Sequence, residues 1–459
     1  MAIEQVVDYI DENRERYVEE LMDLLRIPSV SAVSEHKEDV LKAAEFVADH
    51  FRSMDFDTEI VPTTGHPVVY AEKIVDDGLP TMMVYGHYDV QPVDPIELWR
   101  NDPFEPTIEG PNVVARGATD DKGQMFTHIK AAEAFYRSEG RMPVNLKYII
   151  EGEEEVGSVH LVEFLDAYEE RLSADFAVIS DTGQFAEGVP AITYGLKGLA
   201  YFQIDLKGST QDLHSGSFGG TVANPANVLG QIIAKLRDET GRITIPGFYD
   251  DVLPLEDWER QEFARLPFDE EGYRNYIGAP QLAGEQGYST LERRWARPTL
   301  DVNGIWGGYA GEGSKTVLPA KAGAKISMRL VPRQEPAKVE ELFTSYVRDI
   351  CPPTVELEIQ VMAGAHASIT PTDTKAMDAA RIAIEKGFGK APVMIREGGT
   401  IPVVADLKQK IDVDTILLGW GLPDDGTHSP NEKFNLGDYH RGILASAHLM
   451  NELRQSGLS

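Results

Sequence analysis

The chain has 459 residues, of which 42% are apolar and 26% charged, a globular composition that argues against extensive disorder. Lys and Arg total 43 against 75 Asp and Glu, and the net charge of −32 disfavours nucleic acid and anionic membranes as partners. No apolar run approaches the ~18 residues that span a bilayer, and the acidic N-terminal sequence does not resemble a signal peptide. A single cysteine, Cys351, excludes an intramolecular disulfide and a Cys-rich zinc site. We therefore expect a cytoplasmic protein.

The first part of the chain predicts helices that alternate with strands. Apolar spacing predicts an amphipathic helix over 3–26 and a second helix over about 38–54. Val, Ile and Tyr enrichment predicts strands in TEIVP, HPVVYAEKI and PTMMVYGHYDV. A helix over 122–139 follows, and the buried strands VNLKYII and FAVIS flank a helix near 157–171. Such alternation is typical of an α/β sheet.

Near residue 193 the pattern changes, because YGLKGLAYFQIDLKG alternates like a strand of a half-exposed antiparallel sheet. Residues 246–298 have little periodicity and are interpreted as a surface insertion. Further strands are predicted in AGAKISMRLVP, TVELEIQVMAG and TILLG, and further helices over about 225–239, 335–350, 372–387 and 438–455. The fold class is therefore α/β, with a discontinuous domain over 1–193 and 368–459 and an inserted smaller α+β domain over 194–367.

Acids and histidines gather where predicted strands end. His87 and Asp89 lie two residues apart on a strand and face the same side, where the carboxylate can hold the second ring nitrogen of a metal-bound imidazole. Asp120 and Asp121 are adjacent carboxylates that repel each other unless a cation lies nearby. Each pair has a simpler interpretation, namely a histidine beside a surface aspartate and an aspartate that caps a helix.

More acids and one histidine follow in other loops. EGEEEVGS follows a buried strand and contains enough carboxylates for a metal ligand and a separate general base, although a solvated first helical turn fits equally. Asp181 follows FAVIS and could cap a turn, and His428 lies in a polar loop where it could simply be exposed. Ligands bind beyond the carboxyl ends of strands in open α/β sheets. Two histidines with several carboxylates suit zinc, cobalt or manganese, and the number of acids suggests two ions. No GxSxG elbow, GxxxxGK[ST] loop or post-strand GxGxxG is present.

Five motifs resemble, in order and spacing, the di-zinc co-catalytic metallopeptidases of clan MH, which include aminoacylase, glutamate carboxypeptidase, succinyl-diaminopimelate desuccinylase and carnosine dipeptidase. They are GHYDVQP, RGATDDKGQ, EGEEEVGS, ISD and DDGTHSPNEK. DLHSGSFGG, GSKTVLP, SMRLVP and REGGTIP are similar to the carnosine and cytosolic non-specific dipeptidase branch. The resemblance covers essentially the whole chain. It implies a zinc-hydrolase catalytic domain with an inserted lid and dimerisation domain.

The resemblance implies two divalent metal ions per subunit, with zinc preferred and manganese or cobalt as alternatives. Their implied ligands are His87, Asp120, Glu155, Asp181 and His428, with Asp120 bridging both ions, His87 and Asp181 completing one, and Glu155 and His428 the other.

The resemblance also implies the catalytic groups around these ions. Asp89 would orient His87, and Glu154 would be the general base that activates the water between the metals, which leaves Glu153 as a neighbour. The Asp120–Asp121 peptide is expected to be cis.

Other implied residues lie outside the metal motifs. His214 would reach across a homodimer to stabilise the oxyanion, although a turn histidine fits the sequence alone. Arg329 would hold a substrate carboxylate, to which its planar fork is suited, although a surface strand arginine is the simpler interpretation. Thr316 and Thr400 resemble hydroxyl positions that contact substrate, and Gly399 would let the backbone approach a ligand.

The implied function is hydrolysis of dipeptides or short peptides with a free C-terminal carboxylate, by a metal-bridged hydroxide in a cytoplasmic homodimer. The first alternative is an N-acyl amino-acid amidohydrolase or desuccinylase on the same fold. The second alternative is an inactive binding or scaffold relative. The roles of the 246–298 insertion and of His366 stay unassigned.

Overall fold

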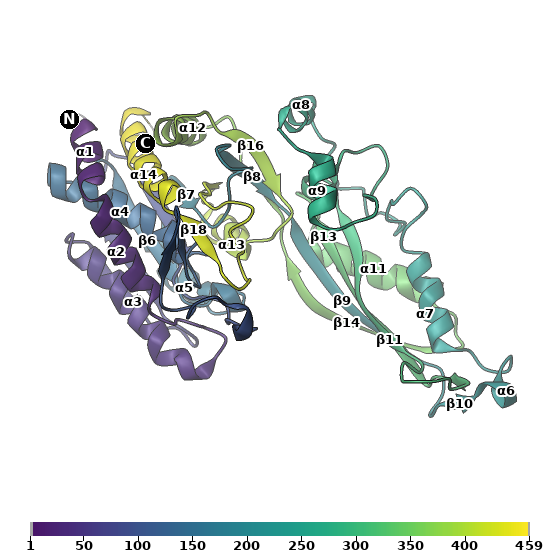
Figure 1. The fold of residues 1–459 in the computed structure, drawn as a ribbon. Coiled ribbons are helices and arrows are strands. Elements are labelled where there is room, and N and C mark those ends of the chain that lie inside the picture. Colours follow the sequence, from purple (N-terminus) through teal and green to yellow (C-terminus); the bar gives the residue numbers. More distant parts are fainter. Residues whose placement is uncertain (1–2, 458–459) are drawn as a thin grey trace. The chain divides into compact units, whose positions relative to one another are not determined.

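The computed structural model describes residues 3–457, and the chain divides into two compact units (Figure 1). Unit 2 contains Gly195–Ile369 and Arg396–Ile401, and unit 1 contains the remaining described residues. The predicted first domain covered 368–459 without interruption, whereas the segment Arg396–Ile401 lies in unit 2. Its contacts explain this, because Arg396 pairs with Glu259 and the N–H of Lys197 donates to the carbonyl of Gly399.

Unit 1 is built on a mixed sheet of nine strands in the order β1-β2-β6-β3-β7-β17-β8-β15, with β16 paired to β8. The neighbours β6, β3, β7 and β17 are parallel, whereas β1 and β2 extend the sheet in antiparallel fashion. The central strands are buried along almost their whole length, as expected where both faces of a parallel sheet are covered. The strands are β1 (Asp57–Val61), β2 (Val68–Lys73), β3 (Thr81–His87), β6 (Asn145–Glu151), β7 (Phe176–Ile179), β8 (Ala191–Leu196), β15 (Ser368–Ile369), β16 (Val393–Glu397) and β17 (Thr415–Leu417).

The helices of unit 1 bury the apolar side chains of this sheet. The almost fully buried α4 contacts β3, and α1, α2 and α14 pack around it. The helix predicted over 3–26 is divided at Asn13, whose side chain donates to the carbonyl of Tyr9 and so competes with the helical backbone. The helices are α1 (Glu4–Glu12), α2 (Arg14–Leu25), α3 (Lys37–Arg52), α4 (Lys122–Glu139), α5 (Leu161–Tyr168), α12 (Lys375–Phe388), α13 (Pro402–Ile411) and α14 (Leu436–Gln455). A small sheet adds β4 (Thr107–Glu109), β5 (Asn112–Val114) and β18 (Lys433–Asn435).

Unit 2 contains an antiparallel sheet in the order β11-β13-β9-β14. Burial alternates along β9, and the buried face packs against α7 and α11, where Phe202 and Phe343 stack. The strands are β9 (Gly198–Lys207), β10 (Leu213–His214), β11 (Thr299–Gly307), β12 (Val317–Leu318), β13 (Lys321–Leu330) and β14 (Glu356–Ala365). The helices are α6 (Ser215–Phe218), α7 (Pro225–Ala234), α8 (Asp257–Arg265), α9 (Glu270–Tyr276), α10 (Thr290–Trp295) and α11 (Pro336–Ile350). The predicted surface insertion over 246–298 therefore contains three short helices, α8 to α10.

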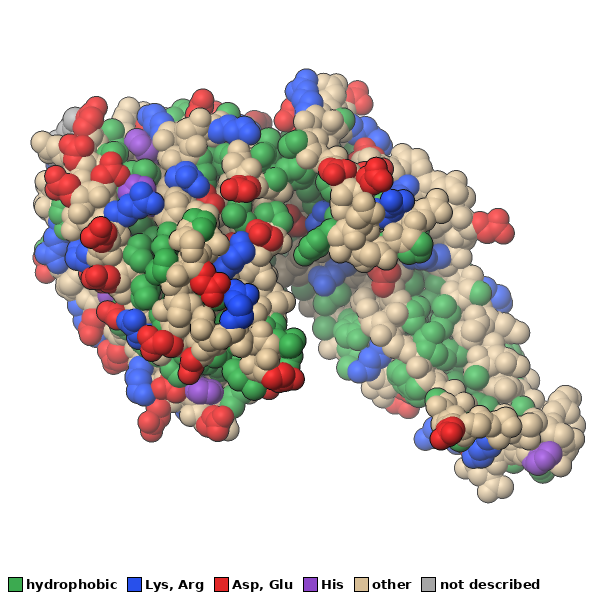
Figure 2. Space-filling model, viewed as in Figure 1, with side chains coloured by type: hydrophobic (Ala, Val, Ile, Leu, Met, Phe, Trp, Pro, Cys, Tyr) green, Lys and Arg blue, Asp and Glu red, His purple; other side chains and the backbone are tan. Residues whose placement is uncertain are grey.

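The expected α/β fold with an inserted α+β unit is confirmed. Acidic side chains are scattered over the visible face of both units (Figure 2). Within residues 3–457, no helix has the length and apolarity needed to cross a membrane.

Candidate functional site

Three neighbouring strand ends of unit 1 bring the predicted acids and a histidine together. His87 is the last residue of β3, Glu154 and Glu155 begin a 3₁₀ turn after β6, and Asp181 follows β7. Because β6, β3 and β7 are adjacent and parallel, their carboxyl ends meet at one edge of the sheet.

Asp120 and His428 reach the same edge from two loops. Nε2 of His428 lies 2.9 Å from Oδ2 of Asp120 and 3.2 Å from Oε2 of Glu155. The Asp120–Asp121 peptide is cis, as predicted. Asp121 stands at the N-cap of α4 but its side chain caps no helical N–H; instead it accepts from the N–H of His87 at 3.3 Å. The simpler interpretation of this pair as a side-chain cap is therefore wrong.

Two groups of ligand atoms result, and they share Asp120. The first is His87, Asp120 and Asp181, and the second is Asp120, Glu155 and His428; the ligand atoms of each group lie within 4.8 Å of one another. In the first group, Nε2 of His87 is 3.2 Å from Oδ1 of Asp120 and 3.9 Å from Oδ2 of Asp181. The five residues expected to bind metal are therefore brought together.

Ligand atoms that make no hydrogen bond show whether the two groups fit metal ions. Within residues 3–457, Nε2 of His87 and Oε1 of Glu155 are buried and make no hydrogen bond. A buried polar atom without a partner costs about 1–3 kcal/mol, a cost that a bound cation would remove. Imidazole nitrogens and carboxylate oxygens without thiols suit zinc, cobalt or manganese. The residues present therefore fit two divalent ions.

The electrostatics of the cluster point to the same conclusion. Burial raises the pKa of Asp181 to about 7, and the charge of Asp120 adds to this effect. Burial also raises the pKa of Glu154 to about 8, with a further contribution from Asp181. Hydrogen bonds to Asp120 and Glu155 raise the pKa of His428 to about 10. Without a metal ion, bound protons therefore reduce the repulsion between the carboxylates of the cluster. Divalent ions would compete with these protons for the same ligand atoms.

The structure shows which of the three glutamates in the 153–155 run faces the ligand groups. The carboxylate of Glu155 faces His428, whereas that of Glu153 bonds to Nδ1 of His160 at 2.9 Å. Glu154 belongs to neither ligand group but lies within the field of His87. Glu155 therefore belongs to the second ligand group, Glu154 stands outside both groups, and Glu153 is bound to His160.

Asp89 connects the strand end to the glutamate turn. It is fully buried, and its Oδ1 lies 3.4 Å from Nδ1 of His87. Its two carboxylate oxygens accept the N–H groups of Glu154 at 3.2 Å and of Glu155 at 3.1 Å. It therefore holds the glutamate turn, while its carboxylate lies beside the ring of His87 and its backbone carbonyl lies 3.1 Å from Nδ1 of that ring.

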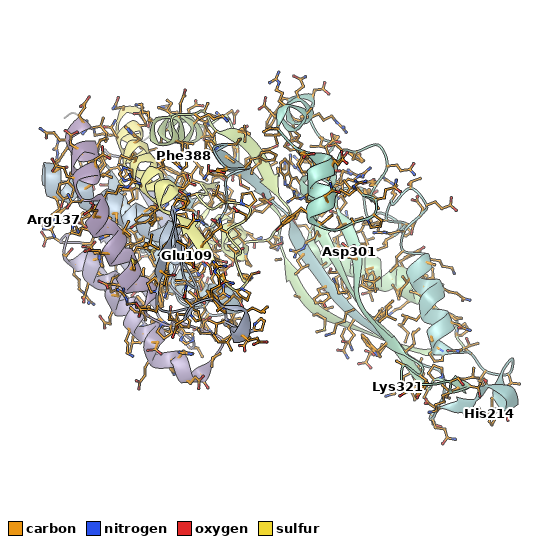
Figure 3. The ribbon with its side chains drawn as sticks, viewed as in Figure 1. Glu109, Arg137, His214, Asp301, Lys321 and Phe388 are labelled. Carbon is orange, nitrogen blue, oxygen red and sulfur yellow. The ribbon has the colours of Figure 1, made fainter. Side chains whose placement is uncertain are left out.

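The other predicted residues belong to unit 2, where they form two separate sets. His214 and Thr316 form the first: the ring of His214 is exposed and accepts from the N–H of Gly216 at 3.0 Å, and the N–H of Ser215 donates to the carbonyl of Thr316. This set lies beyond the Lys321 end of β13 (Figure 3).

Arg329, Gly399 and Thr400 form the second set, at the other end of β13. Nη1 of Arg329 donates to Oγ1 of Thr400 at 2.9 Å, and this hydroxyl donates to the carbonyl of Lys197 at 2.6 Å. His366 lies elsewhere in unit 2, with Nδ1 3.3 Å from Oε2 of Glu335.

Glu432 also holds this edge of the sheet together, although it was not among the predicted residues. It is fully buried, and its Oε1 accepts the N–H groups of Thr119 at 2.9 Å and of Asp120 at 3.0 Å. Its Oε2 accepts the N–H of Gly117 at 2.9 Å and Nη1 of Arg116 at 2.8 Å. A signal was available, because an acid four residues after His428 stands in the same motif.

Comparisons with known proteins agree with these observations. The family model described as peptidase family M20/M25/M40 matches residues 83–452. The Beta-Ala-His dipeptidase of Homo sapiens is 34% identical over 99% of this chain and 93% of its own length. The Cys-Gly metallodipeptidase dug1 of Schizosaccharomyces pombe is 34% identical over 99% of this chain and 98% of its own length.

A solved structure extends the likeness to three dimensions. An M20 family metallo-carboxypeptidase from Sulfolobus solfataricus aligns with a TM-score of 0.85 and 33% identity, over 96% of this chain and 99% of that one. The resemblance to metallopeptidases of the dipeptidase branch is thereby confirmed. The chain belongs to peptidase family M20/M25/M40.

Proposed function

We propose that this metallopeptidase hydrolyses dipeptides or short peptides with a free C-terminal carboxylate, and that it uses two divalent ions, with zinc preferred. The observation that carries the proposal is the sharing of Asp120 by two ligand groups at one sheet edge. The names of the relatives, a Beta-Ala-His dipeptidase and a Cys-Gly metallodipeptidase, support small peptides as substrates.

The ligands of the two ions would be the five residues of the two groups, with Asp120 common to both. Two divalent ions, when bound, lower the pKa of a shared water and polarise the scissile carbonyl. Glu154 then accepts the proton of the attacking water and passes it to the leaving amine, since its carboxylate lies beside both groups without belonging to either. Asp89 keeps His87 in position during the reaction.

Unit 2 would supply the contacts to the rest of the substrate. Arg329 presents a planar fork suited to the terminal carboxylate, with Thr400 fixing one of its nitrogens. The backbone at Gly399 and the hydroxyls of Thr316 and Thr400 would complete the contacts. His214 would donate to the oxyanion of the tetrahedral intermediate.

The spacing within unit 2 supports a homodimer. Lys321 and Arg329 are eight residues apart on one strand, which corresponds to about 26 Å. A dipeptide spans only about 7 Å. If Arg329 and His214 contact the same substrate, His214 and Thr316 must therefore come from a second chain. The edge strands β11 and β14 also expose Ile305 and Val361, which suits association through unit 2.

The general base is tested with a matched pair of variants. We expect Glu154→Gln to lose about 10²- to 10⁴-fold in kcat while keeping both metals, whereas Glu153→Gln, whose carboxylate faces His160, stays active. Metal content and turnover are measured on the same samples. A fully loaded Glu154→Gln enzyme with the rate of the unmodified enzyme would refute the assignment. A panel of dipeptides, tripeptides and N-acyl amino acids separates the peptidase from the amidohydrolase alternative.

The shared site is tested by mixing two inactive chains. His214→Ala should be dimeric and inactive, as should Glu154→Gln. Random exchange gives half mixed dimers, each with one intact site, so activity should recover to about a quarter of the original value. No recovery in verified mixed dimers would refute the contribution of His214 in trans. Cell fractionation tests the expected cytoplasmic location.

A further inference from the structure

A cavity of about 360 Å³ in unit 2 is unusually rich in cations for so acidic a chain. Four arginines line it, together with two acids, Glu285 and Asp301. They are Arg237, Arg293, Arg294 and Arg297. The chain carries 75 acids against 43 basic residues, so a cavity wall in which four arginines outnumber two acids is unexpected.

Only one of the four arginines is neutralised by an ion pair. Arg297 is buried and binds Glu285 through Nε at 2.7 Å and Nη2 at 2.8 Å. Nε of Arg293 donates to the backbone carbonyl of Glu285 at 2.9 Å, and Nη1 of Arg237 donates to that of Leu300 at 3.1 Å. In the described part of the chain, no ion pair joins Arg237, Arg293 or Arg294 to a carboxylate. The cavity therefore offers several N–H donors to an anion.

Hydrogen bonds connect this cavity to Arg329, the arginine proposed to hold the α-carboxylate. Arg329 donates to Thr400, Thr400 donates to the carbonyl of Lys197, and Nζ of Lys197 donates to the carbonyl of Arg293 at 3.0 Å. Thr299, which lines the cavity, is the cross-strand partner of Arg329. Side chains of such partners lie on one face of the sheet, about 5 Å apart at Cβ. The cavity therefore adjoins the side chain of Arg329.

The loop that carries Gly399 and Thr400 also touches the cavity wall. A Cβ added at Gly398 would lie 3.0 Å from the carbonyl oxygen of Arg294. Burial lowers the pKa of Lys197 to about 7, and the charges of Arg329 and Arg294 contribute to this shift. The charges of both arginines therefore reach the same buried amine.

We propose that this cavity binds the side-chain carboxylate of substrates whose C-terminal residue is Asp or Glu, while Arg329 holds the α-carboxylate. The inference rests on the proposed peptidase function and names a substrate class for it. Two carboxylates on one residue match two neighbouring sets of guanidinium donors, which bind carboxylates in a bidentate manner. Asp301, on the cavity wall, opposes this binding by its own charge.

The test compares kcat/KM for Ala-Glu and its uncharged counterpart Ala-Gln. We expect the unmodified enzyme to prefer Ala-Glu, and Arg294→Gln or Arg293→Gln to lower the Glu/Gln ratio about tenfold, the effect of one hydrogen bond to a charged group. Asp301→Asn should raise the ratio. The control Arg348→Gln removes one charge from an exposed position of α11 and should leave the ratio unchanged. An unchanged ratio in both arginine variants would overturn the proposal.

A binding measurement separates this proposal from the proposed function. Calorimetry with metal-loaded Glu154→Gln measures the binding of Ala-Glu and Ala-Gln without turnover. If no peptide is cleaved by the unmodified enzyme but Ala-Glu binds at least tenfold more tightly in an Arg294-dependent manner, the function fails and the cavity assignment stands. Glutarate is the probe for a free anion. Glutarate that binds through Arg294 without displacing Ala-Glu would overturn the assignment to substrate.

Discussion

Glu432 joins the loops of Asp120 and His428, so its replacement tests how the candidate metal site is held. In Glu432→Gln one oxygen becomes a donating amide. In the favoured orientation, the remaining carbonyl oxygen of the glutamine faces the buried Arg116. Its NH₂ group then faces the N–H groups of Thr119 and Asp120, so the two hydrogen bonds from these donors are lost. At about 1–1.5 kcal/mol each, and with a weaker partner for Arg116, unit 1 should lose roughly 3–4 kcal/mol.

The expected consequence is weaker metal binding in a folded protein. Loss of a group that positions a ligand reduces metal affinity by about 10- to 100-fold. Competition with a chromogenic chelator measures the affinity, and thermal melting of the metal-free protein measures the stability. Glu105→Gln is the control, since that side chain is 66% exposed and its ion pair with Arg26 is on the surface. Unchanged metal affinity in folded Glu432→Gln, or an equal loss in the control, would refute the reasoning.

Three further predictions concern pH, metal and a buried ion pair. Burial lowers the pKa of His128 to about 3, so the unfolded chain binds more protons between pH 6.5 and 3 and stability falls as the pH falls; in His128→Gln, urea titrations should show a shallower decline. Chelation should lower the melting temperature and abolish activity, and zinc or manganese should restore both; a melting temperature unaffected by chelation would contradict the metal site. Glu259→Ala removes the carboxylate that pairs with Arg396 and should destabilise unit 2 by about 3–5 kcal/mol, with partial recovery in the double variant Glu259→Ala/Arg396→Met.

The sheet of unit 1 and most candidate ligands could be predicted because two signals coincide in the sequence. Buried parallel strands appear as continuous apolar runs, and the residues after them lie at one edge of the sheet. His87, Glu154, Glu155 and Asp181 could be placed at this edge in this way without knowledge of any contact, although the resemblance supplied their separate roles. Asp120 and His428 were candidates by residue type, but loops have no periodicity that reports their direction, so only the resemblance joined them to the same site.

Other features depend on contacts that no local pattern reports. The short helices of the 246–298 insertion are an example, although α10 has a capping box between Ser289 and Glu292 that was visible as S-x-x-E. Asn13 interrupts a helix through a side-chain hydrogen bond that the surrounding sequence does not predict. Glu432 acts through four donors that precede it by more than 300 residues.

The net charge of −32 is compatible with the proposed anionic substrate because charge is segregated locally. Unit 1 concentrates carboxylates at a sheet edge where their repulsion favours divalent cations. Unit 2 gathers arginines around a cavity beside Arg329 and leaves three of them without an ion pair in the described chain. A substrate of the proposed kind would need both kinds of environment, a cationic centre at the scissile carbonyl and cationic donors at its carboxylates. The average charge of the surface therefore has little bearing on specificity, which depends on the few charges within about one Debye length of the bound substrate.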